Sequence, residues 1–295
     1  MPNPAHLFSV DVEEHFQVSA FDRTLSREEW ERQPSRVERN TEVLLELLAR
    51  HDAHATFFTL GWVAERQPAL LRRIVVSGHE VASHGWWHRR LTSLTREEFR
   101  EEARRSKAVL ETLTGREVKG FRAPSFSIVP GGEWAFDVLL EEGYSYDSSL
   151  FPIRRPDYGY PAAPPVPHQI SRAGGTLLEI PLATLEMLGL RFPAAGGGYL
   201  RQLPLGLVQR SFRAMGERGV PGMFYIHPWE VDPEQPRLPV GPLTRLRHYG
   251  GLERTLPRLE RLLNEFRFTS VERWLGSRGA EGQRDRGAGE AGVAD

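Results

Sequence analysis

Short apolar runs alternate along this chain with longer segments whose apolar residues recur at helical spacing. Strands that alternate with helices pair in parallel through βαβ connections, which predicts an α/β fold. Seven or eight such units favour a barrel over an open sheet. The predicted strands are 6–10, 55–61, 79–84, 118–124, 176–181, 222–228 and 266–271, and the predicted helices are 36–50, 62–78, 95–115, 131–143, 203–219 and 252–266.

The segment 95–115 has the clearest helix boundaries. Thr95 followed by Glu98 is the pattern of a capping box, in which two side chains satisfy free backbone N–H groups. Gly115 is a common helix stop. We therefore expect this helix to begin just after Thr95 and to end just before Gly115.

The chain is long enough for one large core. It has 295 residues, of which 40% are hydrophobic, and barrels of this length often form a single domain. We predict one barrel domain over residues 1–275. The tail 276–295 lacks large apolar side chains, so we predict that it is disordered.

The charge balance and the apolar runs exclude several classes of partner. Lys and Arg number 38 against 39 Asp and Glu, so the sequence gives no sign of nucleic-acid binding. No apolar run approaches the roughly 18–20 residues of a membrane-spanning helix, so we expect no membrane insertion. The first residues lack the basic and apolar regions of a secretory signal, which predicts a cytoplasmic protein.

Polar side chains follow four predicted strands at their C-terminal ends. These residues are Asp11, His84, Arg122 and His227. In βα barrels this end carries the active site, because the βα loops converge there. Four separate strands therefore deliver titratable or cationic groups to one rim, which predicts an active site.

The residue types at this rim indicate a metal-dependent hydrolase. His84 and His88 are four residues apart, so a helix or tight turn would place both imidazoles on one face. The chain has no cysteine, so a metal must take His and carboxylate ligands. The pair and one of the two acids, Asp11 or Glu13, can hold an ion with an open position. The other acid and His227 are then available as base and acid.

Two further segments carry aromatic or proline-rich sequence. Residues 151–175 contain six prolines, and a long proline-rich loop inside a compact domain is usually functional. We expect this loop to wall a substrate groove. Trp86 and Trp87 lie between the two histidines, where each is either core packing or a sugar-stacking wall, with core packing expected for at least one.

Four motifs of this chain resemble those of the polysaccharide deacetylases, the NodB-homology group of carbohydrate esterase family four. They are SVDVEEHF, HGWWH, GFRAPSFS and YIH, and the resemblance covers most of residues 6–275. The resemblance implies a distorted (β/α) barrel of seven or eight strands. It also implies a divalent metal, with zinc expected, held by Glu13, His84 and His88.

The same resemblance implies roles for the remaining motif residues. Asp11 would be the catalytic base, oriented by Arg122, and His227 would protonate the leaving amine. Pro124 completes the third motif, and Asp147 stands where the family has a supporting aspartate near a tryptophan, although no tryptophan is present in YSYDSSLF.

The first motif departs from the family's common form. One residue separates Asp11 from Glu13, whereas the common form has adjacent aspartates. Residues two apart on a strand face the same side, so both carboxylates can still reach the site. Whether Glu13 or Glu14 is the ligand stays open at the level of sequence.

The segments DVEEHFQVSAF, YDSSLFPI, GGGYLRQLP and YIHPWE resemble a subgroup linked to exosortase and exopolysaccharide loci. This resemblance implies an enzyme that removes N-acetyl groups from a sugar of a bacterial polysaccharide or its precursor and releases acetate. The partner would be an N-acetylated glycan, with association with a membrane-bound polysaccharide assembly system and homo-oligomerisation both left open.

Two alternatives remain at this point. One is a related amidohydrolase of the allantoinase-like branch, which a narrow pocket would favour. The other is a non-catalytic carbohydrate-binding barrel. An open groove lined by aromatic residues would favour sugar chains, and the candidates for its lining are Trp87 or its neighbour Trp86, Tyr158 and Trp229.

Overall fold

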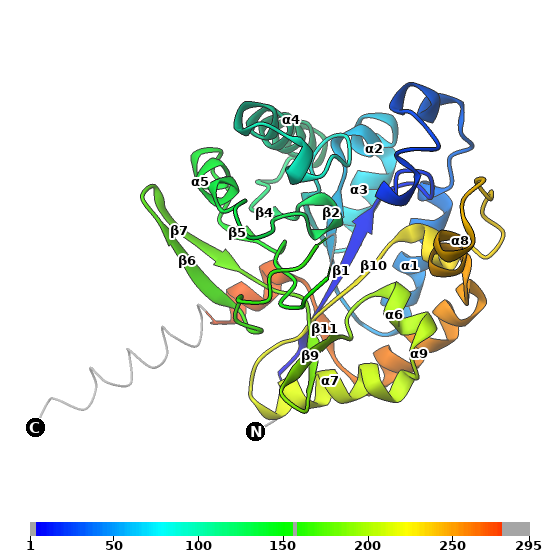
Figure 1. Cartoon of the computed structure of the whole chain (residues 1–295), viewed down its shortest axis with the longest axis vertical. Coiled ribbons are helices and arrows are strands. Elements are labelled where there is room, and N and C mark those ends of the chain that lie inside the picture. Colours follow the sequence, from blue (N-terminus) through cyan, green and yellow to red (C-terminus); the bar gives the residue numbers. More distant parts are fainter. Residues whose placement is uncertain (1–3, 156–157, 279–295) are drawn as a thin grey trace, which may run out of the picture.

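The structure is a computed structural model that describes residues 4–155 and 158–278. A parallel sheet lies at its centre and helices surround it (Figure 1). The strands are β1 (His6–Val12), β2 (Thr56–Thr59), β3 (Glu80–Ser83), β4 (Gly120–Phe121), β5 (Tyr146–Asp147), β6 (His168–Arg172), β7 (Gly175–Glu179), β8 (Thr184–Met187), β9 (Leu190–Pro193), β10 (Met223–Ile226) and β11 (Phe268–Thr269).

The helices follow the strands in the order expected of βα units. Five lie in the first half of the chain, and the later ones pack along the side formed by β10 and β11 (Figure 1). They are α1 (Val37–Arg50), α2 (Gly61–Arg66), α3 (Pro68–Val76), α4 (Arg96–Thr114), α5 (Trp134–Glu141), α6 (Gly197–Gln202), α7 (Leu205–Glu217), α8 (Pro242–Tyr249) and α9 (Thr255–Glu265).

The sheet is a nearly closed barrel of seven parallel strands. Its order is β10-β1-β2-β3-β4-β5-β7, and β6 adds an antiparallel edge beside β7. Leu182, just after β7, forms a parallel bridge with Met223 of β10 and so joins the two ends of the ring. The expected barrel of seven or eight strands is therefore confirmed, with closure by a single bridge as its distortion.

Strand β1 pairs with three other strands. It pairs in parallel with β10 on one side and β2 on the other, and β11 adds a short pairing at its start. All seven of its residues are buried, as expected for a parallel strand covered on both faces. Its carboxyl end is fixed from both sides, so the side chains that it delivers there have little freedom to move.

The predicted boundaries of α4 are confirmed. The Thr95 hydroxyl accepts a hydrogen bond from the Glu98 N–H, and the Glu98 carboxylate accepts one from the Thr95 N–H. Gly115 ends the helix in the left-handed conformation, with φ of 66°. Local side-chain chemistry alone therefore fixes this element.

Several predicted elements need correction. The helix expected over 62–78 is two helices, because Pro68 cannot continue the hydrogen bonding of α2 and instead begins α3. The expected loop 151–175 contains strand β6, which forms a hairpin with β7. The hairpin of β8 and β9 was not predicted.

The predicted disordered tail is wrong for its first residues. Residues 276–278 are helical and continue the helical segment that begins at residue 271. The rest of the predicted tail, 279–295, lies outside the described residues. Within the described part of the chain, no helix is both long enough and apolar enough to cross a membrane.

Candidate active site

The residues predicted to share a rim do lie together at the carboxyl ends of the parallel strands. Asp11 is the penultimate residue of β1, while His84, Arg122 and His227 directly follow β3, β4 and β10. Glu13 directly follows β1. Parallel pairing in register brings these strand ends to one edge, so segments more than 200 residues apart in sequence meet there.

Glu13, His84 and His88 form a buried group of potential metal ligands. One ligand atom from each lies within 4.8 Å of the others. Glu13 Oε2 is 2.7 Å from His88 Nε2 and 4.0 Å from His84 Nε2. Two imidazole nitrogens and one carboxylate oxygen are a donor set suited to zinc with an open coordination position.

The loop that carries the two histidines is a tight turn, one of the two conformations that the sequence allowed. Gly85 adopts φ of 75° and His88 itself φ of 52°, both in the left-handed region. The Glu102 carboxylate of α4 accepts hydrogen bonds of 3.3 Å from the N–H groups of Trp86 and Trp87. The turn is thus pinned from outside, which orients both imidazoles toward Glu13.

The donor atoms of this group fit a bound cation. Glu13 Oε2 is buried and makes no well-aligned hydrogen bond within the described residues, and the Nε2 atoms of His84 and His88 lie next to it. A buried carboxylate oxygen without a partner costs free energy unless something compensates for the loss of water. The His84 Nδ1 atom lies 2.9 Å from the Arg122 carbonyl, which leaves Nε2 free to face the group.

Electrostatics in this group favour a charged carboxylate and neutral imidazole. Burial opposes ionisation of Glu13, but His88, His227 and His84 together lower its pKa well below the ordinary value. Burial lowers the pKa of His84 to about 4. A deprotonated carboxylate and a neutral histidine are the forms that bind metal.

Glu13 rather than Glu14 is the acid that joins the histidines. The Glu14 carboxylate turns away and accepts hydrogen bonds from the Ser35 hydroxyl and the Arg36 N–H at the start of α1. An anionic side chain at a helix N-terminus satisfies free N–H groups, which is a structural role.

Asp11 and Arg122 form a fully buried ion pair beside the group. Arg122 Nη1 donates to Asp11 Oδ1 at 2.6 Å and to Ser9 Oγ at 2.8 Å. The other guanidinium nitrogens donate to the carbonyl and hydroxyl of Ser148, at 3.1 and 2.9 Å. Four directed hydrogen bonds fix the guanidinium, and it in turn holds Asp11 in one orientation.

His227 lies on the other side of Asp11 and Glu13. Its Nε2 atom is 4.0 Å from Asp11 Oδ2 and 3.6 Å from Glu13 Oε1, and its Nδ1 atom is 3.1 Å from Glu230 Oε2. Burial alone would lower the pKa of His227, but Glu13, Glu230 and Asp11 outweigh it and raise the pKa to about 9.

Trp229 does not form the sugar-stacking wall that the sequence suggested. Its indole stacks on His227 at 4.9 Å on one side and on His248 at 4.1 Å on the other, and only 5% of the residue is exposed. The indole N–H donates to Glu13 Oε1 at 3.1 Å. With both ring faces covered, Trp229 supports Glu13 and His227 and has no face left for a ligand.

The other predicted substrate residues differ in their burial and in their contacts. Pro124 is buried and packs near Gly85 of the histidine loop. Trp86 is buried and Trp87 is partly buried, and both line a small pocket against α4. The Tyr158 hydroxyl lies 2.7 Å from that of Tyr199 on α6.

Asp147 supports the Arg122 segment indirectly. Its carboxylate accepts hydrogen bonds from the Ser149 hydroxyl and N–H, and that hydroxyl accepts one from the Ala123 N–H. Glu179, at the end of β7, lies beside it, and burial together with Asp147 raises the pKa of Glu179 well above its ordinary value. The two acids form a second buried carboxyl pair that sequence reasoning missed.

Two further residues of the site were not predicted. Glu230 bonds His227, and Arg201 of α6 donates to Glu230 Oε1 at 2.7 Å. Glu230 had a sequence signal, since it stands three residues after His227 at the start of a short helical turn. Arg201 lies in GGGYLRQLP, one of the segments that resemble the subgroup, but only the fold shows that α6 reaches this rim.

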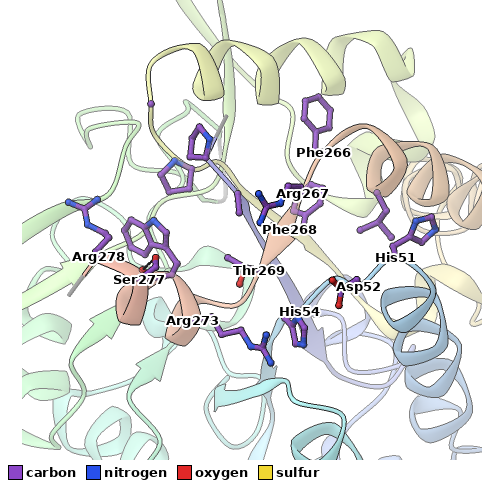
Figure 2. Close-up of a pocket in the computed structure, with 16 residues that line it drawn as sticks. His51, Asp52, His54, Phe266, Arg267, Phe268, Thr269, Arg273, Ser277 and Arg278 are labelled. Atoms are coloured by element: carbon purple, nitrogen blue, oxygen red, sulfur yellow. Dashed lines mark hydrogen bonds between the residues drawn. The ribbon is translucent and has the colours of Figure 1, made fainter. Parts of the chain in front are cut away.

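A large cavity lies at the opposite end of the barrel. It measures about 890 Å³ and opens at the amino ends of β1, β2 and β10. Figure 2 shows side chains of β11, of the helix 271–278 and of the segment before β2 around it. None of the candidate catalytic residues lines this cavity, so size alone does not locate the active site.

Two sequence families match different parts of this chain. The polysaccharide deacetylase family matches residues 21–129, which include His84, His88 and Arg122. A domain of unknown function, DUF3473, matches residues 148–276, which include His227. The second match agrees with the resemblance to the exopolysaccharide-locus subgroup.

Characterised and uncharacterised relatives are similar to parts of the chain. A chitooligosaccharide deacetylase of Sinorhizobium fredii is 36% identical over 100 residues, 34% of this chain and 44% of the relative. A peptidoglycan-N-acetylglucosamine deacetylase of Bacillus cereus is 29% identical over 123 residues, 37% and 44% respectively. An uncharacterised 30.6 kDa protein of Geobacillus stearothermophilus is 28% identical over 171 residues, 52% and 63%. The chain therefore spans less than two thirds of each relative.

Solved structures support the same fold. A Mycobacterium smegmatis protein assigned as a polysaccharide deacetylase has a TM-score of 0.55 at 20% identity, covering 90% of this chain and 92% of its own. The PuuE allantoinase has a TM-score of 0.56 at 19% identity, covering 90% and 88%. At such identities the likeness concerns the fold alone. The chain thus carries a region similar to the polysaccharide deacetylase family over residues 21–129, followed by a region that matches DUF3473 over residues 148–276.

Proposed function

We propose that this protein is a metal-dependent hydrolase that removes N-acetyl groups from an N-acetylated sugar of a bacterial polysaccharide or its precursor and releases acetate. The observation that carries the proposal is the placement of two acids beside one nitrogen of His227. Asp11 and Glu13 both lie within 4.0 Å of His227 Nε2, and Glu13 also meets the two other histidines.

Glu13, His84 and His88 would hold a divalent ion, and zinc suits this donor set. A bound ion would polarise the acetyl carbonyl as a Lewis acid and lower the pKa of a water molecule toward about 7. Family members named as deacetylases of chitooligosaccharide and peptidoglycan support acetamide as the bond that is cleaved.

Asp11 would act as the general base. Its Oδ1 atom is committed to Arg122 at 2.6 Å, while Oδ2 faces His227 across 4.0 Å. The hydrogen bond from the guanidinium holds the Asp11 carboxylate in one orientation. Oδ2 is therefore the oxygen available to take a proton from the attacking water.

His227 would act as the general acid. Its raised pKa, about 9, keeps the imidazole protonated near neutral pH. Nδ1 is occupied by Glu230, so Nε2 is the atom that delivers a proton to the leaving amine. An amine departs readily only when protonated, so this step is needed for amide cleavage.

Aromatic side chains beside His227 suit a sugar ring. Tyr225 is edge-on to His227 at 5.6 Å between ring centroids, and the hydroxyls of Tyr158 and Tyr199 are bonded to one another nearby. Burial first, and then Tyr199, Tyr158, Glu230 and Asp11, raise the pKa of Tyr225 well above its ordinary value. We propose that Tyr158 contacts the glycan from this side.

The test combines metal analysis with acetate release. The purified protein is loaded with zinc, its metal content is measured, and acetate is assayed with N-acetylated chitooligosaccharides, peptidoglycan fragments and a cyclic ureide. We expect acetate from a glycan. The His84→Ala variant should lose both metal and activity, whereas Asp11→Asn should keep its metal and lose roughly 10²–10⁴ in rate.

Each rival function has its own outcome in this test. Hydrolysis of the ureide without acetate release would assign the chain to a different amidohydrolase activity. Glycan binding without turnover, in a protein that takes up no metal, would identify a binding barrel. Full metal content in His84→Ala would overturn the ligand assignment.

A further inference from the structure

We propose that Glu230 is the positioning residue for His227, and that Arg201 of the DUF3473 region holds Glu230 in place. This inference rests on the proposed function, in which His227 is the general acid. It goes beyond that function because it gives a role to residues outside the four motifs and to the second half of the chain.

Two contacts hold the Glu230 carboxylate against His227. Its Oε2 atom lies 3.1 Å from His227 Nδ1 and accepts from the His227 backbone N–H at 3.2 Å. Glu230 is the third residue of a short helical turn, Pro228–Val231, whose N-cap is His227, so its side chain folds back over His227. A carboxylate can only accept at Nδ1, so Nδ1 keeps its proton in both charge states of the ring and Nε2 faces Asp11 and Glu13, where it can give up a proton.

Arg201 fixes the opposite oxygen of Glu230. Both side chains are buried, and Nη1 of Arg201 donates to Oε1 at 2.7 Å. The remaining guanidinium nitrogens donate to the carbonyls of Gly250, Arg247 and His248 at 2.8–3.1 Å. The arginine thus ties α6 and the end of α8 to one carboxylate.

The glycines before α6 make room for this arrangement. A Cβ atom built on Gly197 would collide with the Glu230 carboxylate, and one on Gly196 would collide with the ring of Tyr225. The run GGGYLR therefore lets the helix backbone lie directly against Glu230. Close backbone approach and the arginine together leave the carboxylate one position.

His227, Glu230, Arg201 and the residues that Arg201 contacts all lie between residues 196 and 250. This range falls inside the DUF3473 match and outside the polysaccharide deacetylase match, which ends at residue 129. The first half of the chain supplies the candidate metal ligands and the base. The second half supplies the proposed general acid, His227, and the residues that orient it.

The inference predicts an effect that depends on the leaving group. Loss of a correctly aimed acid slows the expulsion of an amine, which must be protonated. Loss of the same acid hardly slows the expulsion of 4-nitrophenolate, which leaves without a proton. A residue needed only for folding or for metal binding would affect both substrates alike.

The experiment compares Glu230→Gln with the wild type on an N-acetylated chitooligosaccharide and on 4-nitrophenyl acetate, both with the zinc-loaded full chain. We expect the rate with the acetamide to fall by about 10²-fold or more and the rate with the ester to stay close to wild type. Zinc content and melting temperature should stay unchanged. Glu234→Gln, the same chemical change at an exposed residue nearby, is the matched control and should change neither rate.

Arg201→Lys is the second variant, because it keeps a positive charge but cannot make the same set of hydrogen bonds. It should show the same selective loss, smaller than that of Glu230→Gln. Imidazole nitrogen NMR gives a readout independent of turnover. At a pH above about 9, where His227 is neutral, the Nδ1-protonated tautomer should dominate in the wild type and lose its dominance in Glu230→Gln.

The outcomes separate this inference from the proposed function. If His227→Ala also keeps its acetamidase rate, the general-acid role itself is wrong. If His227→Ala is inactive on the acetamide but Glu230→Gln is fully active, only the positioning role is wrong. Equal losses on both substrates, loss of zinc, or an unchanged His227 tautomer in Glu230→Gln would also overturn it.

Discussion

At the scale of single residues, the barrel rim is a concentration of buried charge. Asp11, Glu13, Arg122 and Glu230 are each no more than 1% exposed. Burying a charge is costly unless it is paired and hydrogen-bonded, and replacing one partner leaves the other uncompensated. Each of these groups has an opposite charge or a donor within about 3 Å. Replacing one member of such a pair should therefore destabilise the other.

The pair Asp147 and Glu179 predicts a pH dependence of stability. Burial and the neighbouring Asp147 raise the pKa of Glu179 well above its ordinary value of 4.5, so the folded state holds a proton that the unfolded state releases. The stability that this proton contributes is complete below about pH 4.5 and is lost as the pH rises through the raised value. Glu179→Gln removes this titration yet keeps an oxygen to accept from the Leu150 N–H.

The measurement is urea denaturation at several values between about pH 5 and pH 8. The free energy of unfolding of the wild type should carry a downward contribution of at most about 1.4 kcal/mol per pH unit, and Glu179→Gln should lack that contribution. Glu217→Gln, at an exposed position, serves as the control. Parallel pH profiles for Glu179→Gln and the wild type would show that the pair does not share a proton.

Sequence reasoning found the residues that follow strands and missed those that act through other residues. Asp11, His84, Arg122 and His227 could be placed because a polar residue after an apolar strand has a defined position in a βα barrel. Arg201 and Glu179 could not, because their partners are set by the close approach of β5, β7, α6 and the rim. Trp229 was misread, since its aromatic character does not tell whether its faces are open or covered.

At the scale of elements, boundaries set by local chemistry were predictable and those set by tertiary pairing were not. The capping box of α4 and its glycine stop follow from neighbouring side chains. Strands β4 and β5 have only two residues each and are defined by their partners on either side. The hairpin of β8 and β9 lies outside the barrel, so the alternation of strands and helices carries no signal for it.

The cap of α4 gives a prediction at this scale. Thr95→Ala removes the hydroxyl that accepts from the Glu98 N–H at 3.2 Å, so the free energy of unfolding should fall by about 1 kcal/mol. Thermal and urea unfolding measure the change. Thr95→Ser retains the acceptor, so its free energy of unfolding should fall by much less. The rate of acetate release should be unaffected in both variants. If the alanine variant is as stable as the serine variant, this cap contributes nothing to the free energy of unfolding.

At the scale of the whole molecule, β1, which precedes both matched regions, lies in one ring with strands from each of them. Strand β1, which carries Asp11 and leads into Glu13, pairs directly with β10, which leads into His227. The sheet closes where Leu182 meets β10, so the second region completes the barrel begun by the first. This continuity explains why one family match alone does not contain the whole candidate site.

The same continuity predicts that metal stabilises the entire fold. The candidate ligands come from the ends of β1 and β3, and β1 is the strand that joins β10, β2 and β11. A ligand that binds only the folded state adds about 2.7 kcal/mol at a free concentration of 100 times its dissociation constant. For a chain of this size the melting temperature should rise by roughly 5 °C on adding zinc to chelator-treated protein.

The controls separate specific from general effects of the ion. Asp11→Asn keeps all three candidate ligands and should show a rise in melting temperature similar to that of the wild type. His84→Ala removes one ligand near the centre of the barrel, and its melting temperature should respond weakly or not at all to zinc. A rise in His84→Ala equal to that of the wild type would mean that zinc acts elsewhere on the protein. The group of Glu13, His84 and His88 would then have to be explained as a structural network of buried polar side chains.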